Sequence, residues 1–226
     1  MANGMDKRII VAIDGPAGAG KSTVAKAVAE RMGFLHVDSG AMYRAVALWA
    51  VENNIDPGDG HKLVPLSENA EIDLSGGRVK LNGRDVTAEI RLPEVSSAAS
   101  RVSAIPGVRR ELVMKQQEYA AESSVVMEGR DIGTVVYPRA QVKIYLDASP
   151  EVRARRRVDE SGGDYEQVLR DIRERDERDA TRADSPLRQA EDAVYLDTSA
   201  LDEEGVILAV LRIVREKTSN GKGVTS

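Results

Sequence analysis

The sequence predicts an α/β fold in which a parallel β-sheet is covered by helices on both faces. Short runs of apolar residues, many of them β-branched, alternate along the chain with amphipathic helical segments. This alternation is typical of parallel sheets, whose strands are joined by helical crossovers. Apolar residues make up 42% of the 226 residues, which is enough for a hydrophobic core and excludes a largely disordered chain.

Five apolar runs are expected to form the strands, at residues 8–14, 34–38, 124–127, 142–147 and 193–197. Helices are predicted at residues 22–32, 41–51, 93–104, 106–121 and 206–217, and a mostly charged helical stretch at 153–180 is interrupted at 161–163. Residues 71–86 differ, because alternating segments are separated there by Gly76-Gly77 and Asn82-Gly83. They predict a small antiparallel meander inserted into the α/β core.

Composition excludes several classes of site. The chain has no cysteine and two histidines, so disulfides, thiol catalysis, cysteine zinc sites and histidine-rich metal clusters are excluded. No apolar run has the length of a signal peptide or membrane span, so we expect a cytoplasmic protein without a membrane partner. The formal net charge of −5 argues against nucleic-acid binding. Residues 130–188 nevertheless hold twelve arginines, which suit a small, highly charged anion.

A glycine-rich loop follows the first predicted strand and precedes the first helix: Gly15-Pro16-Ala17-Gly18-Ala19-Gly20-Lys21-Ser22. It matches the pattern G-x-x-x-x-G-K-[ST], in which backbone N–H groups and a helix N-terminus surround phosphate oxygens. Lys21 is expected to reach the β- and γ-phosphates, and the Ser22 hydroxyl to bind Mg²⁺. We interpret this segment as a phosphate-binding loop (P-loop); the alternative is a glycine-rich turn without a ligand.

The loop alone does not define the fate of the terminal phosphate. A GTPase would carry an Asn-Lys-x-Asp motif, and the chain contains no Asn-Lys dipeptide. An AAA-type or transporter ATPase would need an apolar strand that ends in Asp-Glu, whereas Asp147 is followed by Ala148. Neither class is favoured.

Three further segments, together with the P-loop, resemble bacterial cytidylate kinases: DSGAMYR at 38–44, EGRDIGTV at 128–135 and ERDERD at 174–179. The resemblance extends from residue 9 to about residue 214 and includes the meander. It implies a P-loop three-layer fold with a five-stranded parallel sheet, an inserted monophosphate-binding domain and a short lid. It also implies transfer of a phosphoryl group from ATP, with Mg²⁺, to CMP and dCMP.

The resemblance gives an expected domain plan. Residues 5–40 and 122–217 would form the P-loop core, and residues 41–121 the monophosphate-binding domain with the meander at 71–86. Residues 153–182 would form the lid region, and residues 218–226 a flexible tail. We expect a monomer.

Family roles can be placed on matching residues. ATP would bind to residues 15–23, the last three being Lys21, Ser22 and Thr23. At the CMP site, Ser39 and Tyr43 would lie beside the acceptor, and the phosphate would contact Arg44, Arg130 and Arg182. The cytosine edge would contact Ser100, Arg109 and Asp131, and the sugar Arg175 and Asp179. Lys21, Arg130, Arg175 and Arg182 would be catalytic, and Arg153, Arg156 and Arg157 would close over ATP from the lid.

The chemistry of these residues fits the roles. Asp131 can only accept hydrogen bonds, so it would favour the exocyclic amine of cytosine and repel the carbonyl of uracil. Arg175, Asp179 and Arg182 are spaced to share one helix stripe, although Arg175 and Asp179 would also fit a surface ion pair. Tyr43 is expected to lie off the apolar face of its helix.

Some alternatives stay open. The three lid arginines fit a solvated helix face equally well, and Ser100 would also fit as a filler residue on an alanine-rich helix. Another small-molecule P-loop kinase, acting on UMP or a sugar acid, is a competing function. So is a nucleotide-dependent switch without phosphoryl transfer, which the dispersed arginines disfavour because a switch has no acceptor to hold.

Overall fold

The computed structural model describes residues 8–219, which belong to two compact units. Unit 1 comprises the residues up to Val37, Tyr119–Thr181 and those from Ser185 on. Unit 2 comprises Asp38–Glu118 and Arg182–Asp184. Residues 38–40 and 182–184 group with unit 2, and residues 119–121 group with unit 1.

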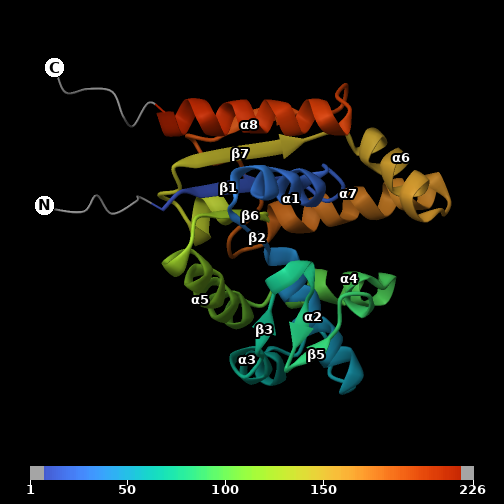
Figure 1. The fold of residues 1–226 in the computed structure, drawn as a ribbon. Coiled ribbons are helices and arrows are strands. Elements are labelled where there is room, and N and C mark those ends of the chain that lie inside the picture. The colour runs from blue at the N-terminus through green and yellow to red at the C-terminus, as the bar shows by residue number, and fades with distance from the viewer. Residues whose placement is uncertain (1–7, 220–226) are drawn as a thin grey trace, which may run out of the picture. The chain divides into compact units, whose positions relative to one another are not determined.

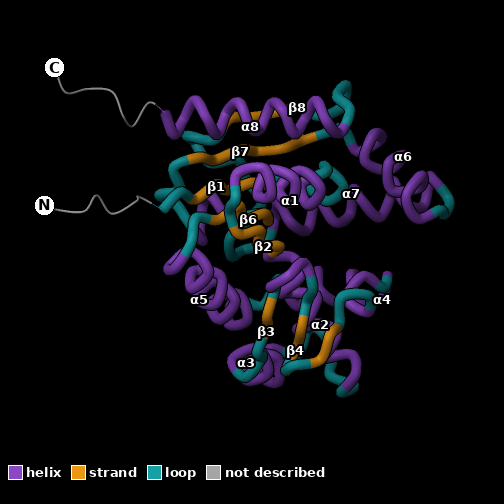
Figure 2. Tube along the Cα trace, viewed as in Figure 1, coloured by secondary structure: helices purple, strands orange, loops and turns teal. Residues whose placement is uncertain are grey.

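Unit 1 is built on a five-stranded parallel sheet with the strand order β2-β6-β1-β7-β8 (Figures 1 and 2). The strands are β1 (Ile10–Asp14), β2 (Leu35–Asp38), β6 (Val125–Gly129), β7 (Val142–Asp147) and β8 (Val194–Asp197). The central strand β1 pairs in parallel with β6 on one side and β7 on the other, which places Asp14 opposite Gly129 and Tyr145. The prediction of a five-stranded parallel sheet is confirmed.

Helices α1 (Lys21–Met32) and α8 (Glu203–Ser219) pack together against this sheet (Figure 1). Alternate strand residues share one face, so Ile13 and Ile144 join Val28 and Val210 in one buried cluster. Helix α8 is longer at both ends than the predicted 206–217. Residues 218 and 219, expected in a flexible tail, are therefore helical, and the remainder of that tail lies outside the described residues.

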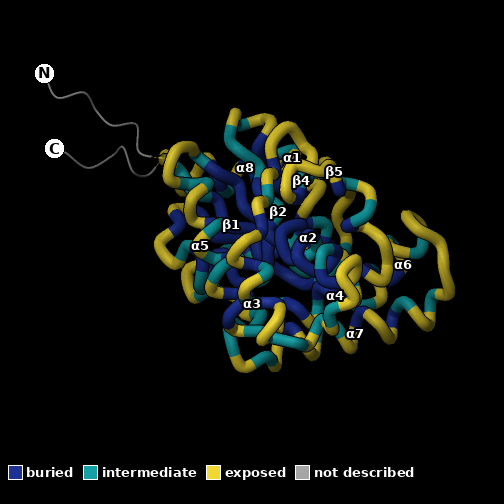
Figure 3. The backbone as a smooth tube through the Cα atoms, turned by 90° about the horizontal axis from the view of Figure 1, so that it is seen from below, coloured by how far each residue is buried: buried dark blue, intermediate teal, exposed yellow. Residues whose placement is uncertain are grey.

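Helices α6 (Pro150–Ser161) and α7 (Tyr165–Thr181) form a pair within unit 1. They are joined by Gly162 and Gly163, whose φ angles of 72° and 111° favour glycine, and the joining turn is exposed (Figure 3). Ala154, Leu169 and Ile172 form the small apolar cluster between them. The charged helical stretch is interrupted as predicted, but at residues 162–164 instead of 161–163.

Unit 2 combines helices with a small antiparallel sheet (Figure 2). Its helices are α2 (Ser39–Glu52), α3 (Gly60–Glu68), α4 (Pro93–Val102) and most of α5 (Pro106–Glu122). Its sheet consists of β3 (Ile72–Asp73), β4 (Lys80–Leu81) and β5 (Arg84–Asp85). The φ angles of Asn82 and Gly83 are 51° and 80°, as a two-residue hairpin turn requires. The predicted meander is confirmed.

Two features of unit 2 differ from the expectations. Helix α3 was not predicted, and its pattern is obscured by Pro65 in its interior; Asp59 caps its first turn. Tyr43 was expected off the apolar face of its helix, but it is only 8% exposed. Helix α2 packs against α3, α4 and the short 3₁₀ turn Glu89–Arg91, and most of its circumference is buried (Figure 3).

Candidate active site

The P-loop connects β1 to α1 at the carboxyl end of the central strand. Gly15, Gly18 and Gly20 have φ angles of 149°, 77° and 85°, a region that favours glycine. A Cβ atom at Gly15 would lie 1.9 Å from the carbonyl oxygen of Leu146, so a larger residue does not fit there. The loop thus lies between a strand and a helix, the context in which a helix N-terminus can bind phosphate.

Lys21, the first residue of α1, is buried among charges of both signs. Its Nζ donates to the carbonyl oxygen of Pro16 at 2.7 Å. Burial lowers the pKa of Lys21 to about 7; the positive charges of Arg130 and Arg175 also lower it, and Glu128 opposes them. A polyphosphate beside these cations would offset both their repulsion and the loss of hydration, so the site favours an anionic ligand.

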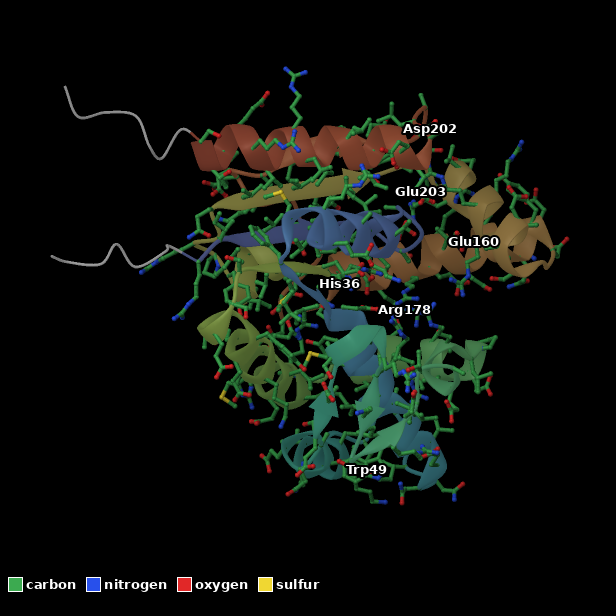
Figure 4. The ribbon with its side chains drawn as sticks, viewed as in Figure 1. His36, Trp49, Glu160, Arg178, Asp202 and Glu203 are labelled. Carbon is green, nitrogen blue, oxygen red and sulfur yellow. The ribbon has the colours of Figure 1, made fainter. Side chains whose placement is uncertain are left out.

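Ser22 and Glu128 form the candidate metal-binding pair. The Ser22 hydroxyl donates to Oε2 of Glu128 at 2.9 Å, and Oε1 of Glu128 lies 3.4 Å from Nε2 of His36 (labelled in Figure 4). Within residues 8–219, no cluster of three or more acidic or histidine side chains could hold a metal. A hydroxyl and a carboxylate nevertheless fit Mg²⁺, which takes few protein oxygens together with substrate phosphates and water.

Glu128 is a residue whose role the sequence analysis missed. It lies at the carboxyl end of β6, the strand beside β1, and is 3% exposed. The available signal was its position as the first residue of EGRDIGTV, directly after an apolar strand.

The proposed CMP-binding residues are divided between the two units. Arg130, Asp131, Arg175 and Asp179 lie in unit 1, and Ser39, Tyr43, Arg44, Ser100, Arg109 and Arg182 lie in unit 2. In unit 1, Nε of Arg130 donates to Oδ2 of Asp179 at 2.9 Å. The side chain of Arg130 is 19% exposed and that of Asp179 is 8% exposed. This pair brings the loop after β6 against α7, two segments that the sequence could not show to be neighbours.

At the start of α2, a second arginine is held by a carboxylate. Asp38 accepts from the backbone N–H of Ala41, which caps the helix, and from the guanidinium group of Arg44 at 2.7 Å. A Cβ atom at Gly40 would lie 3.0 Å from Nη1 of Arg44, so the small residue leaves space for that guanidinium group. Ser39 is buried at the first helical position.

Two other expected site residues of unit 2 meet around α2. The guanidinium group of Arg109 lies 5.4 Å from the ring centroid of Tyr43, a cation–π contact, and donates to the carbonyl oxygen of Ser103 at 3.0 Å. Arg109 is 2% exposed. The Ser100 hydroxyl on α4 is buried, and no hydrogen bond to it is formed from the described residues. A buried hydroxyl of this kind is a favourable position for a polar ligand group.

The three lid arginines differ in their surroundings. Arg153 is buried: it donates to the carbonyl oxygens of Ala148 and Ala17 and forms a bidentate pair with Asp176 on α7. Its guanidinium group thus ties α6 to both the P-loop and α7. Arg156 donates to the hydroxyl and carbonyl oxygens of Thr198 at 3.1 and 2.7 Å. Arg157 is exposed.

A cavity of about 270 Å³ lies beside the P-loop in unit 1. Its lining includes Gly20, Thr23 and Val24 of the loop and α1, together with Arg156 and Thr198. Its lining also includes three carboxylates: Glu160 on α6, Asp202 before α8 and Glu203 at the start of α8 (all three labelled in Figure 4). The cavity therefore adjoins the candidate phosphate site and offers both apolar contact and hydrogen-bond acceptors.

Comparison with known proteins gives consistent matches over nearly the whole chain. The family model described as cytidylate kinase matches residues 11–216. A cytidylate kinase of Solibacter usitatus is 55% identical, covering 98% of this chain and 99% of its own length. A cytidylate kinase of Caldicellulosiruptor bescii is 49% identical, covering 95% and 99% respectively.

Solved structures show the fold at a greater distance. An uncharacterised protein from Eubacterium ventriosum has a TM-score of 0.54 at 13% identity, with 93% of this chain and 99% of that chain covered. A gluconokinase from Sinorhizobium meliloti has a TM-score of 0.50 at 16% identity, with 96% and 98% covered. Among the described residues, no helix combines the length and apolar character needed to cross a membrane.

Proposed function

This chain belongs to the cytidylate kinase family and phosphorylates CMP with ATP as donor, and we propose the residues that perform the reaction. The observation that carries the assignment is a cluster of cations at the P-loop, where the charges of the partly exposed Arg130 and Arg175 act on the buried Lys21. Arg130 also belongs to the EGRDIGTV segment, which resembles this family. It is therefore proposed to act both on Lys21 of the donor loop and on the acceptor.

On the donor side, the phosphates of ATP bind to residues 15–23, and Lys21 contacts the terminal phosphates. Ser22 and Glu128 hold Mg²⁺, which supplies electrostatic stabilisation of the phosphate oxygens when it is bound. The Ser22 hydroxyl donates to Glu128, so a lone pair of its oxygen stays available to a cation.

The base of ATP occupies the cavity beside the P-loop. The cavity is next to Thr23 and Arg156, and its carboxylates and the Thr198 side chain offer acceptors for an exocyclic amine. Of the three lid arginines, Arg156 is the one that lines the cavity, so it is proposed to contact the nucleotide. Arg153 stabilises the P-loop by donating a hydrogen bond to the carbonyl oxygen of Ala17.

On the acceptor side, Arg44, Arg130 and Arg182 bind the CMP phosphate, because guanidinium groups grip phosphate through two donors. Asp131 reads the cytosine amine, with Ser100 and Arg109 at the same edge of the base, and Arg175 and Asp179 contact the sugar. Ser39 and Tyr43 border the acceptor. Acceptance of dCMP, monomeric state, cytoplasmic location and absence of nucleic-acid binding belong to the same proposal.

The residues perform the transfer chiefly by positioning. An oxygen of the CMP phosphate attacks the γ-phosphorus of ATP while the bond from that phosphorus to the bridging oxygen of ADP breaks. The attacking oxygen is already anionic, so no general base is needed. Lys21, Arg130, Arg175 and Arg182 offset the charge that is spread over the transferred group. Closure of the lid region at 153–182, with Gly162 and Gly163 as its flexible point, would exclude water as a competing nucleophile.

Steady-state turnover with CMP, dCMP, UMP and AMP at equal concentrations tests the acceptor assignment. We expect CMP and dCMP to be the preferred acceptors. A preference for UMP or AMP would contradict the cytosine assignment, and nucleotide binding without transfer to any monophosphate would favour a switch.

The Asp131→Asn variant tests base recognition in the same assay. An amide can both donate and accept, so we expect the ratio of kcat/KM for CMP over UMP to fall about tenfold or more. An unchanged ratio would remove Asp131 from base recognition.

A further inference from the structure

Asp14, the last residue of β1, is a buried carboxylate that has no role in the proposed mechanism. It is 5% exposed and directly precedes Gly15 of the P-loop. Its two oxygens accept separate backbone hydrogen bonds: Oδ1 from the N–H of Ile132 at 2.8 Å and Oδ2 from the N–H of Gly133 at 2.7 Å. Both donors lie more than a hundred residues away along the chain.

Ile132 and Gly133 open a short π-helical turn, Ile132–Val136, which follows Arg130 and Asp131. Val135 and Val136 donate to the carbonyl oxygen of Asp131, which closes the turn. Asp131 is the capping residue of the turn, and its side chain makes no capping hydrogen bond. The first N–H groups of any helical turn lack a partner within the turn. Asp14 supplies that partner from another strand, so the Asp131 carboxylate is not used as the cap.

The Gly129–Asp131 segment is thereby fixed at two points. Gly129 is held in register opposite Asp14 by the sheet, and Ile132 and Gly133 are held by the Asp14 side chain. Gly133 permits this close approach, because a Cβ atom there would lie 3.3 Å from Oδ2 of Asp14 and 3.2 Å from Cδ of Lys143. Arg130 and Asp131 lie between the two fixed points.

We propose that Asp14 is a positioning residue for the acceptor site: from the position directly before the P-loop, it fixes the backbone that presents Arg130 and Asp131 to CMP. The inference depends on the proposed function for the roles of those two residues. The contacts themselves are independent of it. Burial raises the pKa of Asp14 to about 6, although the two backbone N–H groups act to lower it.

Asp14→Asn tests the proposal at nearly constant size. An amide has one acceptor oxygen, and its NH₂ group would face the second N–H donor, so one end of the turn is released. We expect KM for CMP to rise at least tenfold and the Kd for ATP to change less than twofold. In the nucleotide-free protein, amide hydrogen exchange within residues 129–137 should accelerate at least tenfold, with the remainder of unit 1 unaffected.

A matched control is Asp59→Asn, which alters a carboxylate of the same kind at the N-terminus of α3, where Asp59 accepts from the N–H of Lys62. Its effect on exchange should be confined to α3, and KM for CMP should stay within twofold. If Asp14→Asn does not fold, Gly133→Ala replaces it, because its methyl group crowds the same contact and leaves the carboxylate in place. The same two effects are expected.

Equal changes in the Kd for ATP and the KM for CMP would overturn the proposal, because they would show a general role in the P-loop. Unchanged exchange in residues 129–137 would overturn it as well. Failure of the proposed function is distinguishable, since wild-type protein would then not phosphorylate CMP, while the exchange experiment needs no nucleotide.

Discussion

Lys21 is an ionisable residue of the candidate site whose charged form is destabilised by its surroundings. Its pKa is lowered to about 7 by burial and by the neighbouring arginines, so much of the population is neutral at physiological pH. Bound phosphates favour the charged form, since an adjacent negative charge raises the pKa of an amine. We therefore expect Lys21 to be fully protonated when a nucleotide is bound and partly neutral when it is not.

This predicts proton uptake on ATP binding. At pH 8 a lysine with a pKa near 7 is about 90% neutral, so ATP binding should take up close to one proton from solution. Calorimetric titration in buffers of different ionisation enthalpy measures this number. The Lys21→Arg variant, whose guanidinium stays charged, serves as the control, and equal uptake by both proteins would contradict the prediction.

Arg130 is expected to act on the transferring group. We predict that Arg130→Ala lowers kcat about 100-fold or more, because an electrostatic donor to the transition state is lost. The Kd for ATP should change by less than about threefold, as uniform binding is retained.

The partner of Arg130 needs its own control, because the substitution leaves Asp179 without that ion pair. Asp179→Asn removes the carboxylate and retains the arginine. Because Asp179 is itself proposed to contact the sugar, the two variants are compared in thermal stability: an equal loss in both would show that the pair supports the fold.

At the scale of elements, two ion pairs connect α6 and α7, and they differ in burial. Arg153 is 3% exposed and pairs with Asp176 at 2.6 Å, whereas Arg173 and Glu151 pair at 2.7 Å with more than half of the Arg173 side chain exposed. A buried cation that loses its partner is costly, while an exposed pair contributes little in water. Of the two ion pairs, only the buried one should therefore contribute measurably to the stability of the helix pair.

Asp176→Ala is predicted to lower the free energy of unfolding by about 3 kcal/mol, because it leaves Arg153 buried and uncompensated. Urea denaturation measures the change. Arg173→Ala breaks the exposed pair between the same helices and should lie within experimental error of the wild type. Similar losses in both variants would show that burial does not decide the contribution.

For the whole molecule, Asp14 links stability to pH. Its pKa is about 6 in the folded protein and 3.8 in the unfolded chain, so between these values the folded state keeps a proton that the unfolded state has released. The associated stabilisation is complete below about pH 4 and is lost as the pH rises to about 6. At neutral pH the ionised carboxylate costs about 3 kcal/mol relative to acid conditions.

The prediction concerns the difference between wild type and Asp14→Asn in the free energy of unfolding. This difference should shift by about 3 kcal/mol against the wild type between pH 4 and pH 7, and remain constant above pH 7. Urea titrations over this range check it, and titrating groups that do not interact with Asp14 cancel in the comparison; Lys21, whose charge interacts with Asp14, does not. A difference independent of pH would contradict the raised pKa.

The sequence by itself determined the elements with strong local signals. The five strands, the break in the charged helical stretch and the two-turn meander follow from apolar periodicity and from glycine and asparagine at positive φ, which are properties of neighbouring residues. The P-loop could likewise be predicted, because its glycines and Lys21 lie within one short segment of the chain. Helix α3 was not readable, since Pro65 obscures its pattern and its formation depends on packing against α2.

Only the tertiary structure decided which charges meet. Glu128 lies beside Ser22, Arg130 beside Asp179, and Asp14 beside Ile132 and Gly133, each across a large distance in the chain. It also showed that the arginines expected in the lid have different surroundings: Arg153 is buried against Asp176, whereas Arg156 lines the cavity. The physical reason is that strand order brings distant segments to one edge of the sheet, and a local pattern carries no record of strand order.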